Sequence, residues 1–102
     1  MREKSFFVYI LASQKNGSLY TGMTNALQTR TLEHKNKANS KSHMAKYNIT
    51  RLVYYEHHDT PDSAIDREMF IKKHTRKYKI KLIEKDNPDW SELYWRLSKT
   101  DI

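Results

Sequence analysis

The sequence predicts an α/β fold of the α+β type: a small three-stranded antiparallel sheet flanked by helices, in the order β-β-α-β-α-α. Three observations predict it: a β-branched and aromatic stretch at residues 5–12, an Asn-Gly turn shortly after it, and helical spacing that begins only past residue 24. The chain has 102 residues with no internal repeat and no linker, so we expect a single domain over residues 1–102.

The first two strands are expected to form a hairpin. Residues 5–12 carry little polarity, which is typical of a strand covered on both faces, and residues 18–24 form the return strand. Asn16-Gly17 between them suits the two positive-φ positions of a type I′ turn.

This turn predicts which side chains share a face. A two-residue loop makes the numbers of paired residues sum to 33, which places Tyr9 opposite Thr24 and Leu11 opposite Gly22. Tyr9 and Tyr20 then lie on the same face, and Gly22 opens space between them. A loop that changed the pairing by one residue would separate the two tyrosines.

A helix is predicted over residues 25–36, with Asn25 as its N-cap. Arg30 and His34 are four residues apart, so they share a face of this helix. Residues 37–50 are basic and lack apolar periodicity, which is typical of an irregular segment.

A third strand is predicted over residues 51–57. The next helix is expected to begin at Thr60 or Asp62, since either side chain can cap it and Pro61 suits the first turn. A further helix is expected over residues 76–85.

The net charge of +7 points to an anionic partner, of which nucleic acid is the commonest. Residues 35–51 carry five cationic residues and no acid, and residues 72–81 carry six and no acid. The alternative is that these residues only keep the surface soluble. The cations that we expect to contact phosphates are Lys46, Lys72, Lys73 and Arg76.

The absence of cysteine excludes disulfides and thiolate metal sites. The five histidines are scattered apart from one adjacent pair, so we expect no zinc site. No stretch approaches the roughly 20 apolar residues of a membrane span, and the N-terminus lacks the long apolar run of a signal peptide. We therefore expect a cytoplasmic protein that does not insert into membranes.

The order and spacing of several residues resemble the GIY-YIG nuclease domain, most closely its small single-domain bacterial branch. The resemblance spans residues 5–93, and the first triplet departs from the family name because it has no glycine. Ala45-Lys46-Tyr47 is also similar to the small branch. The motif residues are Phe7-Val8-Tyr9, Tyr20-Thr21-Gly22, Arg30, His34, Glu68 and, in the NPDW segment, Asn87 in the place of the family's active-site asparagine.

This resemblance implies an enzyme that hydrolyses phosphodiester bonds of nucleic acid, DNA rather than RNA, with one Mg²⁺ or Mn²⁺ ion and no small-molecule cofactor. It makes Glu68 the metal ligand and Arg30 the phosphate clamp. Tyr9 or His34 is the general base, with tyrosine preferred, and Tyr20 orients the water or the phosphate.

The chemistry of these residue types is consistent with those roles. One carboxylate can hold Mg²⁺ while several waters remain on the ion, and the planar guanidinium of Arg30 matches a phosphate. A tyrosine has a pKa of about 10 and needs a cation to lower it, whereas a histidine titrates near neutrality.

Glu68 also has a purely structural interpretation, since acids early in a helix stabilise its dipole. Its helical spacing to Ile65, Met69 and Lys72 predicts that it lies beside apolar core positions, where it would need a metal or Arg30 as a partner. Asn87 could equally cap the turn before Pro88.

Two other functions remain open at the level of sequence. One is a basic nucleic-acid-binding module with little or no catalysis, and the other is a scaffold that binds an acidic protein. Trp90, Tyr94 and Trp95 are expected to complete the core rather than form a contact surface, so we expect a monomer.

Overall fold

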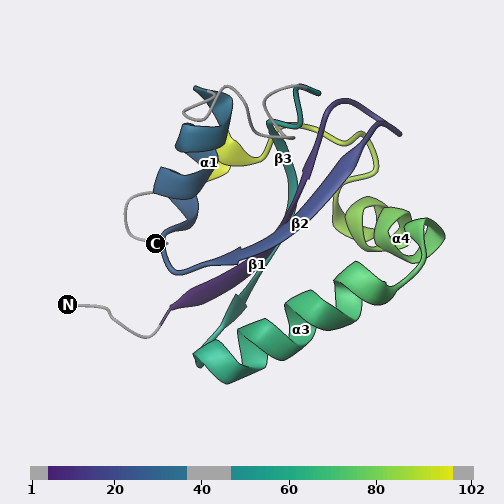
Figure 1. Cartoon of the computed structure of the whole chain (residues 1–102). Helices are drawn as coiled ribbons and strands as arrows, with labels where there is room; N and C mark the ends of the chain where they lie inside the picture. Colours follow the sequence, from purple (N-terminus) through teal and green to yellow (C-terminus); the bar gives the residue numbers. More distant parts are fainter. Residues whose placement is uncertain (1–4, 37–46, 98–102) are drawn as a thin grey trace.

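The computed structural model describes residues 5–36 and 47–97 (Figure 1). The predicted Lys46 and most of the irregular basic segment lie outside these ranges. The elements are β1 (Phe6–Ala12), β2 (Leu19–Thr24), α1 (Leu27–Lys35), β3 (Arg51–His58), α3 (Pro61–Lys73), α4 (Arg76–Asp86) and the short 3-10 helix η1 (Tyr94–Arg96).

The three strands form one antiparallel sheet in the order β2-β1-β3, which confirms the predicted fold class. Helix α1 lies on one face of the sheet, and α3 and α4 lie on the other (Figure 1). Within the described ranges, no helix is long and apolar enough to cross a membrane.

β1 is the central strand and divides the core into two layers. Its odd-numbered residues pack with α1 and the C-terminal segment, and its even-numbered residues pack with α3 and α4. The first layer contains Phe7, Tyr9, Leu11, Leu27, Ile49, Leu52, Leu93, Tyr94 and Leu97. The second contains Val8, Ile10, Ala12, Val53, Ala64, Ile71, Ile83 and Trp90. β1 is therefore covered on both faces, as predicted.

The predicted turn between β1 and β2 is wrong in type and length. Within this turn Asn16 has a positive φ, of 61°, but Gly17 lies outside the left-handed region that a type I′ turn also requires at that position. The Ser13 amide donates to the Ser18 carbonyl at 3.0 Å, so four residues rather than two form the loop.

The longer loop shifts the register by two residues. Tyr9 lies opposite Gly22, and Leu11 opposite Tyr20, so the paired numbers sum to 31 rather than 33. A shift of two preserves the alternation of side chains between faces. Tyr9 and Tyr20 therefore share the α1 face of the sheet, as the sequence predicted.

The helix starts confirm one predicted cap and correct another. Thr60 caps α3 by accepting a hydrogen bond from the Ser63 amide, whereas Ala26, not Asn25, is the N-cap of α1. No side chain of the described residues caps α1, and the Thr24 hydroxyl accepts from the Ala26 amide at 3.0 Å where the chain passes from β2 into the helix.

The segment after α4 closes the edge of β3. Asn87 is the C-cap of α4, and its side-chain amide donates to the Val53 carbonyl at 3.1 Å. Its side-chain oxygen accepts from the Ser91 amide at 2.9 Å, which is the capping role foreseen for it. Trp90 is fully buried as expected, but Trp95 is largely exposed, so its predicted place in the core is wrong.

Candidate active site

Three aromatic rings meet on the α1 face of the sheet. Tyr9 comes from β1, Tyr20 from β2 and His34 from the last turn of α1. The ring centroids are 6.2 Å apart for the two tyrosines, 6.4 Å for Tyr9 and His34, and 5.9 Å for Tyr20 and His34. The structure thus brings together two phenols and an imidazole that 25 residues of sequence separate.

Gly22 makes this arrangement possible because its missing side chain leaves room for the tyrosine rings. A Cβ at this position would lie 2.7 Å from both Cζ and the hydroxyl oxygen of Tyr9, and 2.9 Å from Cε2 of Tyr20. Both tyrosines would have to move, and Tyr9 is buried where there is no free space.

Replacing Gly22 with alanine is expected to disrupt the ring cluster. The clash should lower the free energy of unfolding by about 1–3 kcal/mol, as overpacked cores generally do. The variant Gly17→Ala provides a comparison in the exposed hairpin loop, since its Cβ would meet the Ser13 hydroxyl, the Gln14 side chain and, at 3.1 Å, the Gln14 backbone nitrogen instead of buried rings. Urea denaturation would measure both variants, and equal losses of stability would contradict the special role of Gly22.

The environment of Tyr9 keeps its phenol protonated. The side chain is 1% exposed, and burial raises its pKa well above the ordinary 10.0. The nearby Tyr20 raises the pKa further, through its charge and a hydrogen bond, while the positive charge of Arg30 lowers it. Tyr9 is therefore a poor base in the protein alone.

His34 has the opposite character. Burial lowers its pKa below 6.5, the charge of Arg30 lowers it further, and Glu33 opposes both. Its Nε2 atom is buried and finds no hydrogen-bond partner among the residues that the structure describes. Near neutral pH this imidazole is uncharged, so it can accept a proton.

Arg30 stands at the solvent side of the cluster. Its side chain is 49% exposed, and its Nε lies 3.4 Å from a carboxylate oxygen of Glu33 one turn later. An exposed pair of this kind is weak, so the guanidinium is available to an anion that approaches the rings.

Glu68 belongs to α3, which packs on the opposite face of the sheet from the ring cluster. It is spaced four and three residues from the buried Ala64 and Ile71, so it faces the sheet, and its side chain is only 19% exposed. The predicted neighbours Ile65 and Met69 are exposed rather than part of the core. The predicted inward direction of Glu68 is therefore right, although the residues used to infer it were not.

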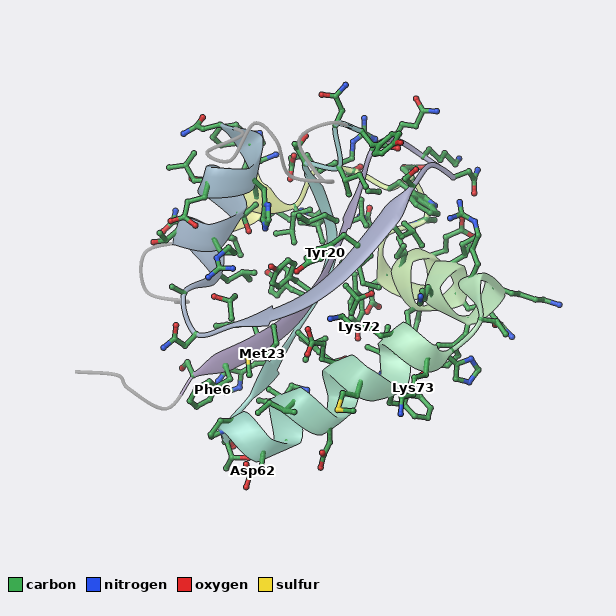
Figure 2. The ribbon with its side chains drawn as sticks, in the orientation of Figure 1. Phe6, Tyr20, Met23, Asp62, Lys72 and Lys73 are labelled. Atoms are coloured by element: carbon green, nitrogen blue, oxygen red, sulfur yellow. The ribbon has the colours of Figure 1, made fainter. Side chains whose placement is uncertain are left out.

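Two observations connect Glu68 to the site. α3 packs along β2, the strand that carries Tyr20, and the charge of Glu68 contributes to the raised pKa of Tyr9. Among the described residues its ion-pair partner is Lys72 rather than Arg30, with Lys72 Nζ 3.1 Å from a carboxylate oxygen. Figure 2 shows Lys72 pointing from α3 toward the sheet, whereas Lys73 points away.

The donor set fits a hard divalent cation with a large share of water ligands. Within residues 5–36 and 47–97, no three histidine, aspartate or glutamate side chains gather closely enough to hold a metal by themselves. A single carboxylate suits Mg²⁺ or Mn²⁺, because such ions are commonly held by one or two carboxylates, waters and substrate phosphates. Lys72 would have to release Glu68 when an ion binds.

The other predicted site residues lie elsewhere or serve the fold. Arg76 donates to the carbonyls of Asn16 and Gly17 at 2.8 and 2.7 Å, and so ties α4 to the hairpin loop. Asn87 uses its amide to hold the C-terminal segment against β3. Neither of these contacts places the residue with the ring cluster.

A polar network on the other face of the sheet was missed by sequence reasoning. Glu56 accepts hydrogen bonds from Tyr54, from His58 Nε2 at 2.6 Å and from Arg67 Nε at 3.0 Å. Burial acts to raise the pKa of Glu56, but these bonds outweigh it and lower that pKa. Alternate residues of one strand share a face, so the spacing of positions 54, 56 and 58 could have revealed the network.

This network fixes the orientation of α3. Arg67 directly precedes Glu68, and it also donates to the Tyr78 hydroxyl on α4 at 3.3 Å. The ion pair between Arg67 and Glu56 therefore anchors the turn of α3 that carries Glu68.

The sequence is similar to a known catalytic domain and to several bacterial proteins. The model of the GIY-YIG catalytic domain matches residues 5–81. A UPF0213 protein of Clostridium perfringens is 42% identical over 77 residues, covering 76% of this chain and 81% of the relative. A UPF0213 protein of Staphylococcus epidermidis is 37% identical over 78 residues, covering 76% and 93% of the two chains.

A solved structure is similar over most of the chain. The solution NMR structure of a UPF0213 protein from Bacillus halodurans superposes with a TM-score of 0.53 at 26% identity. The match covers 86% of this chain and 92% of that one.

Proposed function

The chain belongs to the GIY-YIG family, and we propose that it is a divalent-metal-dependent endonuclease that hydrolyses phosphodiester bonds of nucleic acid, DNA rather than RNA. The match to the family's catalytic domain agrees with the resemblance in the sequence. One observation carries the proposal: rings from β1, β2 and α1 converge beside the Arg30 cation, and the Glu68 charge acts on Tyr9 from α3.

Each of these residues has a separate role in the proposed reaction. Water attacks the phosphorus, and the bond to the leaving sugar oxygen breaks. Arg30 donates from its planar guanidinium to the phosphoryl oxygens, where negative charge builds up. Glu68 would hold the metal ion, which when bound stabilises charge on the phosphoryl and leaving oxygens.

His34 is the proposed general base, rather than the tyrosine that the resemblance favoured. The lowered pKa of His34 keeps the imidazole uncharged, so that a ring nitrogen can accept a proton from the attacking water, whereas the raised pKa of Tyr9 disfavours its phenolate. Tyr9 and Tyr20 then serve as hydroxyl groups that orient the water or the phosphate.

The pH dependence of cleavage should distinguish the two bases. With His34 as base, kcat/KM is expected to fall as the pH drops through the depressed imidazole pKa, so the acid limb lies below pH 6.5. With Tyr9 as base, the rate would still be rising at the upper end of the profile, because the phenol pKa lies above 10.0. A profile from about pH 5 to about pH 10 measures this. If the acid limb shifts when Mn²⁺ replaces Mg²⁺, the titrating group is metal-bound water rather than His34.

The activity itself is tested by nicking of supercoiled plasmid with purified protein. Conversion to the open-circular form should require Mg²⁺ or Mn²⁺ and should stop with EDTA. A parallel set of DNA and RNA oligonucleotides, single- and double-stranded, would define the substrate. If the protein binds DNA but cleaves no substrate under all of these conditions, the proposed nuclease activity is refuted.

One observation favours a second candidate, a nucleic-acid-binding module on the same fold. Glu68 already has a cationic partner in Lys72, and that ion pair competes with a metal. The plasmid experiment separates the two functions. In either case we propose that the protein is a cytoplasmic monomer that does not bind membranes and needs no small-molecule cofactor.

A further inference from the structure

A cluster of aromatic rings lies on the outer side of the junction between α3 and α4. His74 stacks on Tyr78 with ring centroids 4.0 Å apart and planes inclined by 25°. Phe70 is 5.3 Å from His74 and 5.8 Å from Tyr78, in an edge-to-face arrangement with the latter. Phe70 is 49% exposed and His74 is also exposed, so two of the three rings face solvent.

The cluster is distinct from the site around Glu68. Phe70 follows Glu68 by two residues, which turns it by about 200° around the helix. Figure 2 shows the same division, with Lys72 directed toward the sheet and Lys73 away from it. The two surfaces are separated by one helix, whose diameter is about 10–12 Å.

The rings are held in place before any ligand arrives. The guanidinium of Arg67 lies 5.6 Å from the centre of the Phe70 ring, and it is itself fixed by Glu56 and the Tyr78 hydroxyl. The backbone amide of Thr75 donates to Nδ1 of His74 at 3.0 Å. A surface organised in this way loses little conformational entropy on binding.

The chain segment that carries the rings is rich in cations. Lys73 lines a hollow of about 250 Å³ together with Phe70, His74 and Thr75. Residues 69–83 contain no acid. An exposed aromatic face beside lysines matches a nucleobase that stacks while its phosphate meets the cations, which is how single strands are commonly bound.

From these contacts we infer that Phe70 and His74, with Lys73, form a stacking platform for an unpaired nucleobase. The preferred substrate is then a nucleic acid with a single-stranded segment next to a duplex, where the duplex lies at the Glu68 side of α3. The inference rests on the proposed function for its nucleic-acid partner, but not on cleavage.

Binding in EDTA tests the platform without cleavage. The full chain would be titrated with a blunt DNA duplex and with the same duplex carrying a single-stranded tail of about six nucleotides that includes 2-aminopurine. The wild type should bind the tailed DNA more tightly and quench the 2-aminopurine. Phe70→Leu combined with His74→Gln should weaken binding of the tailed DNA about 5- to 100-fold and abolish the quenching, with blunt-duplex affinity unchanged.

Two variants complete the design. Phe70→Tyr keeps an aromatic face and should retain the preference for the tail. Trp95→Leu removes an exposed aromatic ring outside the cluster and should change nothing. Thermal melts would show that each variant is folded.

Three results would overturn the inference: equal affinity of the wild type for tailed and blunt DNA, an equal loss on both DNAs in the platform variant, or self-association of the wild type that Phe70→Leu abolishes. Its failure is distinguishable from failure of the proposed function. A preference for tailed DNA without metal-dependent cleavage would support the stacking platform and refute the proposed nuclease activity. Metal-dependent cleavage without a preference for tailed DNA would support the nuclease activity and refute the stacking platform.

Discussion

Glu68→Gln is expected to lower metal-dependent cleavage by at least about 10³-fold. The substitution keeps the size of the side chain but removes the only carboxylate proposed to hold the ion. A bound metal supplies several kcal/mol of transition-state stabilisation, and each 1.36 kcal/mol is about tenfold in rate. Single-turnover cleavage of a labelled duplex would measure the loss.

A second readout separates metal binding from catalysis. Mn²⁺ binding, followed by the electron paramagnetic resonance of the free ion, should disappear in Glu68→Gln, while DNA affinity in EDTA is retained. Asp66→Asn is the matched control, because it neutralises an exposed acid on the same helix. Comparable losses in both variants, or an active Glu68→Gln protein, would refute the assignment of Glu68.

Arg30→Ala is expected to reduce kcat by about 10²–10³-fold, as removal of a preorganised donor to transition-state charge usually does. Arg30→Lys should recover only part of that rate, since an ammonium lacks the planar fork of a guanidinium. Stability should change by at most about 1 kcal/mol, because the pair with Glu33 is exposed on both sides.

Separate measurement of kcat and KM for Arg30→Ala shows whether Arg30 acts in the transition state or in substrate binding. A transition-state clamp lowers kcat with little change in KM, whereas a general phosphate contact weakens binding and leaves kcat intact. Lys85→Met is a suitable control, since it removes an exposed cation from the end of α4. A loss confined to KM would make Arg30 a binding residue only.

Local features of the sequence were sufficient for much of the fold. The run of β-branched and aromatic residues at 5–12 predicted a strand covered on both faces, and Thr60 with Pro61 predicted the start of α3. Such patterns are reliable because the interactions behind them join residues a few positions apart. The predicted Asn25 cap is wrong because the helix begins one residue later, after a strand-to-helix turn in which the Ala26 amide donates to the Thr24 hydroxyl, and no helix pattern contains that contact.

The hairpin shows how a wrong local interpretation can still give the right face. The turn type and register were incorrect, yet the shared face of Tyr9 and Tyr20 survived because the error was an even number of residues. The loop length depends on the Ser13–Ser18 closure and on Arg76 from the distant α4, which no turn motif reports.

The sequence by itself determined the element order, the shared face of the two tyrosines and the set of residue types available for chemistry. Only the tertiary structure decided what each residue can do. Burial lowers the pKa of His34 and raises that of Tyr9, and hydrogen bonds to distant segments give Arg76 and Asn87 structural roles. The physical reason is that desolvation and hydrogen bonding depend on neighbours supplied by other strands and helices, whereas a sequence pattern records only neighbours along the chain.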